Sequence, residues 1–188
     1  MPQQELLRRV IQALEAANID YMVTGSLVSS LQGEPRSTHD IDLLVSVERA
    51  SVDDLLQGLS SPEFYLDRES ILEAIATKSM FNLIDVHEGD KVDFWILTEE
   101  PFDKSRFARK YSEEVMGIRM KVSSPEDTIL AKLRWAKLSG GSEKQFTDAL
   151  RVYEVQFPNL DIQYLNSWSE QLQIRDLWER LQEEAEIP

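Results

Sequence analysis

The chain contains no cysteine and only two histidines, His39 and His87. Without cysteine, disulfides and thiolate metal sites are excluded, and a reducing compartment poses no difficulty. The two histidines offer no metal-binding cluster of imidazoles. A metal-dependent phosphohydrolase, which needs an activated water, is therefore not suggested by the sequence.

Long hydrophobic runs are also missing. No stretch approaches the roughly 20 apolar residues of a membrane-spanning helix. The apolar segment 6–17 is interrupted by Arg8, Arg9, Gln12 and Glu15, so it does not resemble a signal peptide. From these features we expect a cytoplasmic protein without a membrane partner.

Basic residues are scarce, with 20 Lys and Arg against 34 Asp and Glu, and the formal net charge is −14. An acidic surface repels phosphate backbones, so broad nucleic-acid binding is not expected, although a local basic patch could dock an RNA end. A small substrate, a protein or a basic partner suits this charge better. With 188 residues, of which 42% are hydrophobic, the chain can build one core, or a core with a helical annex.

The most informative segment is residues 21–47, in which an apolar strand, a polar loop and a second apolar run follow one another. The second run opens with Asp40-Ile41-Asp42. Because successive side chains of a strand point to opposite faces, the two carboxylates project to the same side, about 7 Å apart along the chain. Neighbouring carboxylates repel each other unless a cation lies between them, and Mg²⁺ prefers oxygen ligands. The pair predicts half of a metal site.

Apolar periodicity and turn residues predict the other elements. Helices are expected over 6–17, 27–31, 52–59, 70–78, 102–110, from Pro125 to Gly140-Gly141, from Ser142 with Gln145 as its capping partner, over 162–172 and over 175–184. Strands are expected over 19–24, 41–47, 80–87, 92–97, 111–115 and 118–122, the last four as two hairpins. This pattern predicts an α/β (α+β) fold, with a mixed central β-sheet flanked by helices. We expect a core over 1–123 and a helical C-terminal part over 124–188 that packs on it as one compact unit.

Three short motifs carry a resemblance to a known family. They are GS at residues 25–26, at a strand-to-helix turn, RSTHDID at 36–42, and the lone strand carboxylate in KVDF at 91–94. Together they resemble the minimal nucleotidyltransferase fold of the polymerase-beta superfamily. The nearest likeness is to small bacterial nucleotidyltransferase-like proteins, including the toxin branch of abortive-infection toxin–antitoxin systems. The resemblance covers residues 20–154.

The resemblance implies an enzyme that moves an NMP group from a nucleoside triphosphate to a hydroxyl on a protein, an RNA end or a small molecule. It implies Mg²⁺ or Mn²⁺ as cofactor, a possible toxin role and a possible antitoxin partner. Asp40, Asp42 and Asp93 become the catalytic and metal-binding residues, two holding the triphosphate metal and the third completing the site that activates the acceptor hydroxyl. If the resemblance is set aside, the alternative interpretation is that Asp40 caps a turn and that Asp42 and Asp93 are solvated acids at strand ends.

The turn at Gly25-Ser26 is the expected phosphate site. A strand, a turn and a helix in this order direct backbone N–H groups and the positive helix end at one spot. Ser26 would donate to a terminal phosphate, although it could equally cap the helix. Arg36 and Thr38 complete the expected nucleotide-binding residues, with an exposed Arg36 as the simpler alternative.

Two further nucleotide-binding candidates lie on the predicted C-terminal helices. Lys132 is at the edge of an apolar stripe and could reach inward to phosphate, as a lysine does in the toxin-like relatives. Asp148 resembles an acid in their following helix, but it lies opposite the stripe formed by Phe146 and Leu150. Pattern alone therefore predicts that Asp148 faces solvent.

A second reading belongs to another class of protein: a catalytically silent member of the same fold that binds nucleotide or a partner protein. The acidic composition is compatible with it. The sequence leaves open the base of the nucleotide, the acceptor, the oligomeric state and the physiological role.

Overall fold

The structure is a computed structural model that describes residues 3–60 and 62–187. It divides into two compact units. The first unit comprises Met1–Thr24 and Thr38–Val122, and the second comprises Gly25–Ser37 and Ser123–Pro188. A short excursion of the chain after the first strand thus belongs to the same unit as the C-terminal helices.

The first unit is built on a mixed seven-stranded sheet with the order β3-β4-β5-β2-β1-β7-β6. Its strands are β1 (Asp20–Thr24), β2 (Asp40–Ser46), β3 (Phe64–Tyr65), β4 (Met80–Asp85), β5 (Lys91–Ile96), β6 (Tyr111–Val115) and β7 (Ile118–Val122). β2 pairs parallel with β5, and β1 pairs parallel with β7, while the other neighbours are antiparallel. The mixed sheet confirms the predicted fold class, and only the two-residue β3 was not predicted.

Turn residues explain why both predicted hairpins form. Met116 and Gly117 join β6 to β7 with φ values of 51° and 71°. Positive φ at both central residues is the requirement of the hairpin turn whose twist matches that of the strands. Gly89, between β4 and β5, also has a positive φ, of 77°.

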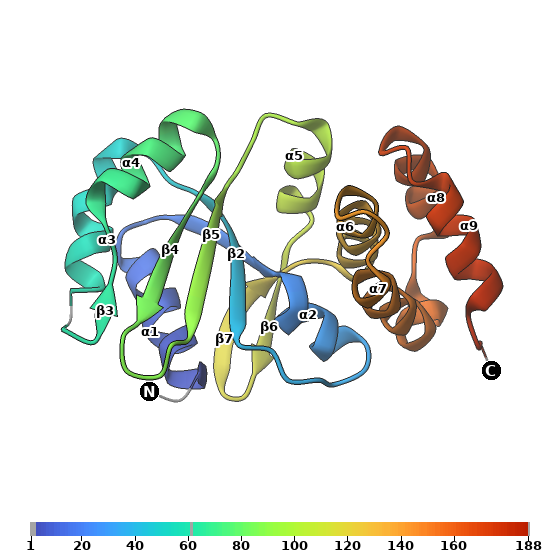
Figure 1. Cartoon of the computed structure of the whole chain (residues 1–188), viewed down its shortest axis with the longest axis horizontal. Coiled ribbons are helices and arrows are strands. Elements are labelled where there is room, and N and C mark those ends of the chain that lie inside the picture. The colour runs from blue at the N-terminus through green and yellow to red at the C-terminus, as the bar shows by residue number, and fades with distance from the viewer. Residues whose placement is uncertain (1–2, 61, 188) are drawn as a thin grey trace. The chain divides into compact units, whose positions relative to one another are not determined.

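Helices cover the sheet of the first unit (Figure 1). They are α1 (Gln3–Ala16), α3 (Val52–Gly58), α4 (Arg68–Thr77) and α5 (Pro101–Ala108), with a 3-10 turn at Arg49–Ser51. α1 contacts β1 and α3, and α4 contacts α3 and β4. Met22 of β1 and Leu44 of β2 form a small core cluster with Phe107 of α5. Trp95 and Leu97 pack against this cluster. No helix among the described residues is both long and apolar enough to cross a membrane.

The second unit is helical. It consists of α2 (Gly25–Gln32), α6 (Pro125–Leu138), α7 (Glu143–Gln156), α8 (Ile162–Gln171) and α9 (Arg175–Glu184), with a 3-10 turn at Phe157–Asn159. The Ser124 side chain caps α6 by accepting from Asp127 N, as predicted. The same prediction is wrong for Ser142, whose side chain makes no capping hydrogen bond. Its backbone N–H is instead used to end α6, by donating to the Ala136 carbonyl at 3.2 Å.

α2 lies very close to α7 at Gly33. The Gly33 N–H donates to Ser29 O at 2.9 Å, which ends α2. A Cβ atom built on Gly33 would lie 2.8 Å from Val152 N and 2.9 Å from Arg151 C, both backbone atoms of α7. Only glycine allows this approach, which fixes the start of the loop that leads to Arg36.

We predict that Gly33→Ala lowers the free energy of unfolding by about 1–3 kcal/mol, because helix α7 has to shift to relieve the overlap. Urea denaturation monitored by circular dichroism measures the loss. Glu34→Ala is the matched control, since its exposed side chain makes a surface ion pair with Arg151 and its loss should change stability by less than about 0.5 kcal/mol. Equal stabilities of the two variants would contradict the close approach.

Candidate functional site

The parallel pairing of β2 and β5 brings the predicted acids of the first unit together. The register aligns Asp40 with Lys91 and Asp42 with Asp93. Aligned residues of neighbouring strands lie about 4.8 Å apart and point to the same face, and so do residues two apart in one strand. All four side chains therefore share one face, with the carboxylates of Asp42 and Asp93 side by side.

A polar row crosses the sheet at this level. Thr24 of β1 is aligned with Asp42, and Asn82 of β4 is aligned with Asp93. The row therefore runs Thr24, Asp42, Asp93, Asn82 across four adjacent strands. Neither Thr24 nor Asn82 was predicted as a site residue from the sequence. The hairpin register of β4 and β5 was the signal that could have identified Asn82.

Burial differs among the three acids. Asp93 is only 7% exposed, Asp42 is half-buried and Asp40 is exposed. Asp93 Oδ2 accepts from Lys91 Nζ at 2.9 Å, whereas its buried Oδ1 accepts no hydrogen bond from the described part of the chain. Trp95 Nε1 donates to Asp42 Oδ1 at 3.4 Å.

The donor set fits a hard divalent cation, which prefers carboxylate oxygens. Asp42 and Asp93 would supply the central ligands and Asp40 a further one from the same face. In the conformation described for residues 3–60 and 62–187, however, no three acidic or imidazole side chains lie close enough together to hold a metal ion. The predicted acids share a face, but they are not yet gathered into a complete ligand set.

Thr38 serves the backbone at the entry to β2. Its Oγ1 donates to Asp40 O at 3.2 Å, and its own carbonyl accepts from Gln3 Nε2 at 2.8 Å. His39 is 90% exposed and lies 3.6 Å from Asp90. Thr38 therefore fixes the position of Asp40, and its predicted contact with nucleotide stays a prediction.

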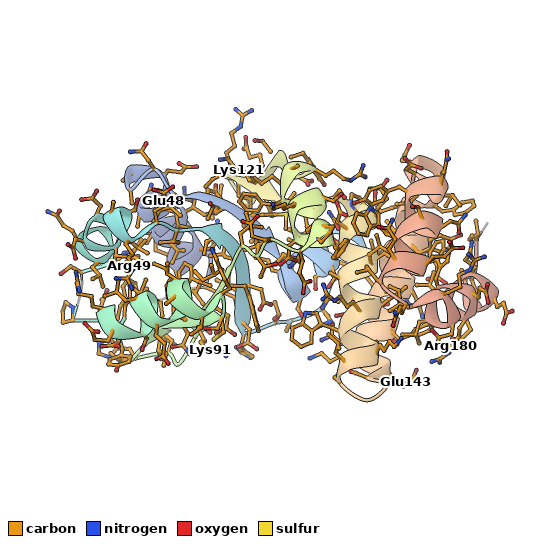
Figure 2. All side chains as sticks on the ribbon, turned by 90° about the horizontal axis from the view of Figure 1, so that it is seen from above. Glu48, Arg49, Lys91, Lys121, Glu143 and Arg180 are labelled. Atoms are coloured by element: carbon orange, nitrogen blue, oxygen red, sulfur yellow. The ribbon has the colours of Figure 1, made fainter. Side chains whose placement is uncertain are left out.

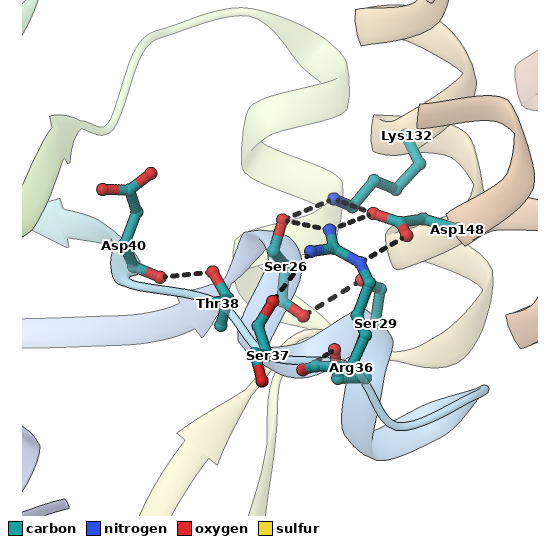
Figure 3. Close-up of polar contacts among 9 residues, drawn as sticks. Ser26, Ser29, Arg36, Ser37, Thr38, Asp40, Lys132 and Asp148 are labelled. Carbon is teal, nitrogen blue, oxygen red and sulfur yellow. Dashed lines mark hydrogen bonds and ion pairs between the residues drawn. The ribbon is translucent and has the colours of Figure 1, made fainter. Parts of the chain in front are cut away.

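A second polar cluster lies within the second unit, around Ser26 (Figure 3). Gly25 starts α2 directly after β1 with a φ of 70°. The Ser26 hydroxyl accepts from Arg36 Nη2 at 2.9 Å and from Lys132 Nζ at 3.1 Å. Both cations also bind Asp148, Arg36 with two bonds of 2.9 and 2.7 Å and Lys132 with one of 2.8 Å.

The cluster combines two positive charges with one negative charge. Lys132 is 4% exposed and Asp148 is 9% exposed. Burial by itself raises the pKa of Asp148, but the hydrogen bonds from Arg36 and Lys132 outweigh it and lower that pKa below its ordinary value. The hydrogen bond with Asp148 raises the pKa of Arg36. Because the Ser26 hydroxyl accepts from both cations, its own proton is available to an anion.

The structure corrects the prediction that Asp148 faces solvent. Helical periodicity scores only apolar character, whereas a carboxylate can be buried when cations compensate it. Lys132, at the edge of the apolar stripe of α6, is buried and points inward to Ser26, as predicted.

A pocket of about 150 Å³ opens beside Arg36 and Asp148. Its lining consists of Ser29, Glu34, Pro35, Arg36, Thr147, Asp148 and Arg151. Sites for drug-sized ligands usually have volumes of roughly 300–1,000 Å³. The pocket is therefore smaller than a typical site for a drug-sized ligand.

A family model described as aminoglycoside-2''-adenylyltransferase matches residues 6–96, just under half of the chain. The matched segment contains Asp40, Asp42 and Asp93, and it ends before Lys132 and Asp148. A search of curated proteins finds no match.

Solved structures share the fold. ANT(2'')-Ia in complex with adenylyl-2''-tobramycin has a TM-score of 0.59 at 15% identity, covering 93% of this chain and 99% of that one. The lincomycin-bound lincosamide antibiotic adenylyltransferase LnuA has a TM-score of 0.53 at 12% identity, covering 82% and 98%. An antigenic nucleotidyltransferase-like protein from Paracoccidioides brasiliensis has a TM-score of 0.51 at 19% identity, covering 97% and 92%. At these identities the likeness establishes the fold.

We predict that Asp148→Asn destabilises the protein by about 3 kcal/mol, because Lys132 then stays buried without its ionised partner. The double variant Asp148→Asn/Lys132→Met should recover most of this loss, as measured by urea denaturation. Since the pKa of Asp148 is lowered on folding, its contribution is present above the unfolded pKa and disappears as the pH falls through the folded pKa. The difference from wild type should thus shrink in acid. A pH-independent difference, or additive losses in the double variant, would argue against the pairing.

Proposed function

We propose that this chain is a nucleotidyltransferase, which transfers an NMP group from a nucleoside triphosphate to a hydroxyl acceptor with the help of a divalent metal ion. The family match and the shared fold support this proposal. The observation that carries the proposal is the in-register alignment of Asp42 with Asp93 on parallel strands. Nothing in the packing of a core requires two neighbouring carboxylates on one face. Such pairs are typical of sites that bind cations.

In the proposed reaction, the acceptor hydroxyl oxygen forms a bond to the α-phosphorus, the bond from that phosphorus to the bridging oxygen breaks, and pyrophosphate leaves with the bonding electrons. Mg²⁺ or Mn²⁺, when bound, would stabilise the charge on the attacking and leaving oxygens. Asp42 and Asp93 would supply the central ligands of the ion and Asp40 a further one. Asp93, whose buried Oδ1 has no hydrogen-bond donor among the described residues, would also take the hydroxyl proton.

We assign phosphate recognition to Ser26, Arg36 and Lys132. The support is the net positive charge of their cluster with Asp148 and the available Ser26 proton. Gly25 and the first turn of α2 would add backbone N–H groups.

For the acceptor, we propose a small, basic, hydroxyl-bearing molecule of the aminoglycoside kind. The description of the matching family supports this class. The net charge of −14 also supports it, because an acidic surface attracts a polycation. A toxin role with an antitoxin partner rests on the sequence resemblance alone and stays a prediction, as does a catalytically silent form.

We predict that Asp42→Asn and Asp93→Asn each lower metal-dependent transfer of labelled nucleotide by about 10³-fold, because several kcal/mol of transition-state stabilisation are lost. Asp54→Asn is the matched control, since Asp54 is an exposed acid on α3 of the same unit. Circular dichroism should show an intact fold in all three variants. Full transfer activity in Asp42→Asn would contradict the assignment.

Expression in susceptible bacteria separates the acceptor classes. We expect wild type to raise the aminoglycoside concentration that the cells tolerate, and Asp42→Asn to leave it unchanged. Growth arrest without antibiotic, dependent on Asp42, would instead favour the toxin role. If neither effect occurs, and purified protein binds ATP, CTP, GTP or UTP with Mg²⁺ but transfers nothing, the silent form is favoured.

A further inference from the structure

Lys91, labelled in Figure 2, lies on β5. By the strand register, its positively charged side chain shares a face with the aspartates of β2 and β5. Its Nζ lies 2.9 Å from Asp93 Oδ2, and its register partner is Asp40. The hydrogen bond to Asp93 raises the pKa of Lys91, burial opposes this, and the charges of Asp93, Asp40 and Asp42 raise it further. The ammonium group therefore binds Asp93 directly and lies on the face that also carries Asp40 and Asp42.

This ammonium occupies an oxygen that a divalent ion would use. Lys91 binds Oδ2 of the most buried acid, and in the same conformation no three acidic or imidazole groups of the described residues are gathered for a metal. Asp93 Oδ1 meanwhile has no hydrogen-bond donor within residues 3–60 and 62–187. Half of the Asp93 carboxylate is thus ready for a ligand, and the other half is held by lysine.

Lys91 can leave this position at low cost. Its side chain is 37% exposed, and a lysine ammonium on a flexible four-carbon stem can turn into water without losing its hydration. Strand pairing fixes the backbones of Asp42 and Asp93, so their carboxylates cannot move apart in the same way. Without Lys91, repulsion between the aspartate carboxylates would lower the stability of the protein whenever no other cation is bound.

We propose that Lys91 is a positioning residue that holds the carboxylates of Asp40, Asp42 and Asp93 together when no divalent ion is bound, and that competes with such an ion for Asp93. The proposal rests on the proposed function, in which Asp93 is a metal ligand. The consequence is weak binding of free metal ions, because each ion has to displace an ammonium group that is tethered two residues away.

The test is a titration of purified full-length protein with Mn²⁺ at constant pH and ionic strength, in which electron paramagnetic resonance measures the free ion. We expect Lys91→Met to bind Mn²⁺ at least about tenfold more tightly than wild type, since a positive charge at hydrogen-bond distance is removed from a partly exposed site. Lys91→Gln should behave in the same way and serves if the methionine variant folds poorly.

Lys121→Met is the matched control. Lys121, also labelled in Figure 2, lies in the same unit and pairs with Asp20 at 2.6 Å. Its side chain is 41% exposed, close to the 37% of Lys91, and its loss changes the net charge equally. We expect its Mn²⁺ affinity to equal that of wild type, because Asp20 is at the far end of β1 from Thr24.

Unfolding temperatures give a readout that is independent of activity. Without metal, Lys91→Met should unfold at a lower temperature than wild type, and saturating Mn²⁺ should raise its unfolding temperature by more. A merely structural lysine would lower stability without changing the response to Mn²⁺, and that result would overturn the proposal.

Asp93→Asn distinguishes a failure of this inference from a failure of the proposed function. If Asp93→Asn abolishes Mn²⁺ binding while Lys91→Met and wild type bind equally, Asp93 is a ligand and the role of Lys91 is overturned. If Asp93→Asn leaves Mn²⁺ binding unchanged, or if no variant binds Mn²⁺, both the metal site and the role of Lys91 are overturned.

Discussion

Two carboxylates held side by side on neighbouring strands repel each other, and the parallel pairing of β2 and β5 gives the backbones of Asp42 and Asp93 no way to separate. The rest of the acid face follows from this constraint. A row of polar side chains surrounds the pair, and an ammonium group from the same strand as Asp93 binds one of its oxygens. Such a pair does not stabilise a sheet, so its presence indicates a binding function.

The second unit also contains buried charges that are compensated by charges of the opposite sign. Asp148 is buried because Arg36 and Lys132 both bind it, and the same two cations converge on the Ser26 hydroxyl. Here the excess charge is positive, so the cluster favours an anion, whereas the acid face of the first unit favours a cation. Close packing at Gly33 fixes the start of the loop that carries Arg36.

Much of this could be predicted from the sequence, because its signals are local. Period-two alternation placed Asp40 and Asp42 on one face, and turn residues identified both hairpins. The alignment of Asp42 with Asp93 and of Asp40 with Lys91 depends on a pairing between distant strands, which no local pattern specifies. Asp148 was missed as a buried residue because its burial depends on two cations, and one of them is 112 positions away in the chain.

The central claim, that Asp42 and Asp93 bind a divalent ion for nucleotidyl transfer, is tested most directly by a crystal structure with Mn²⁺ and a nonhydrolysable nucleoside triphosphate. Anomalous scattering locates the manganese without reference to the protein density. We expect a manganese peak about 2.1 Å from carboxylate oxygens of both aspartates. A nucleotide bound with manganese elsewhere, and with neither Asp42 nor Asp93 among the ligands, would contradict it.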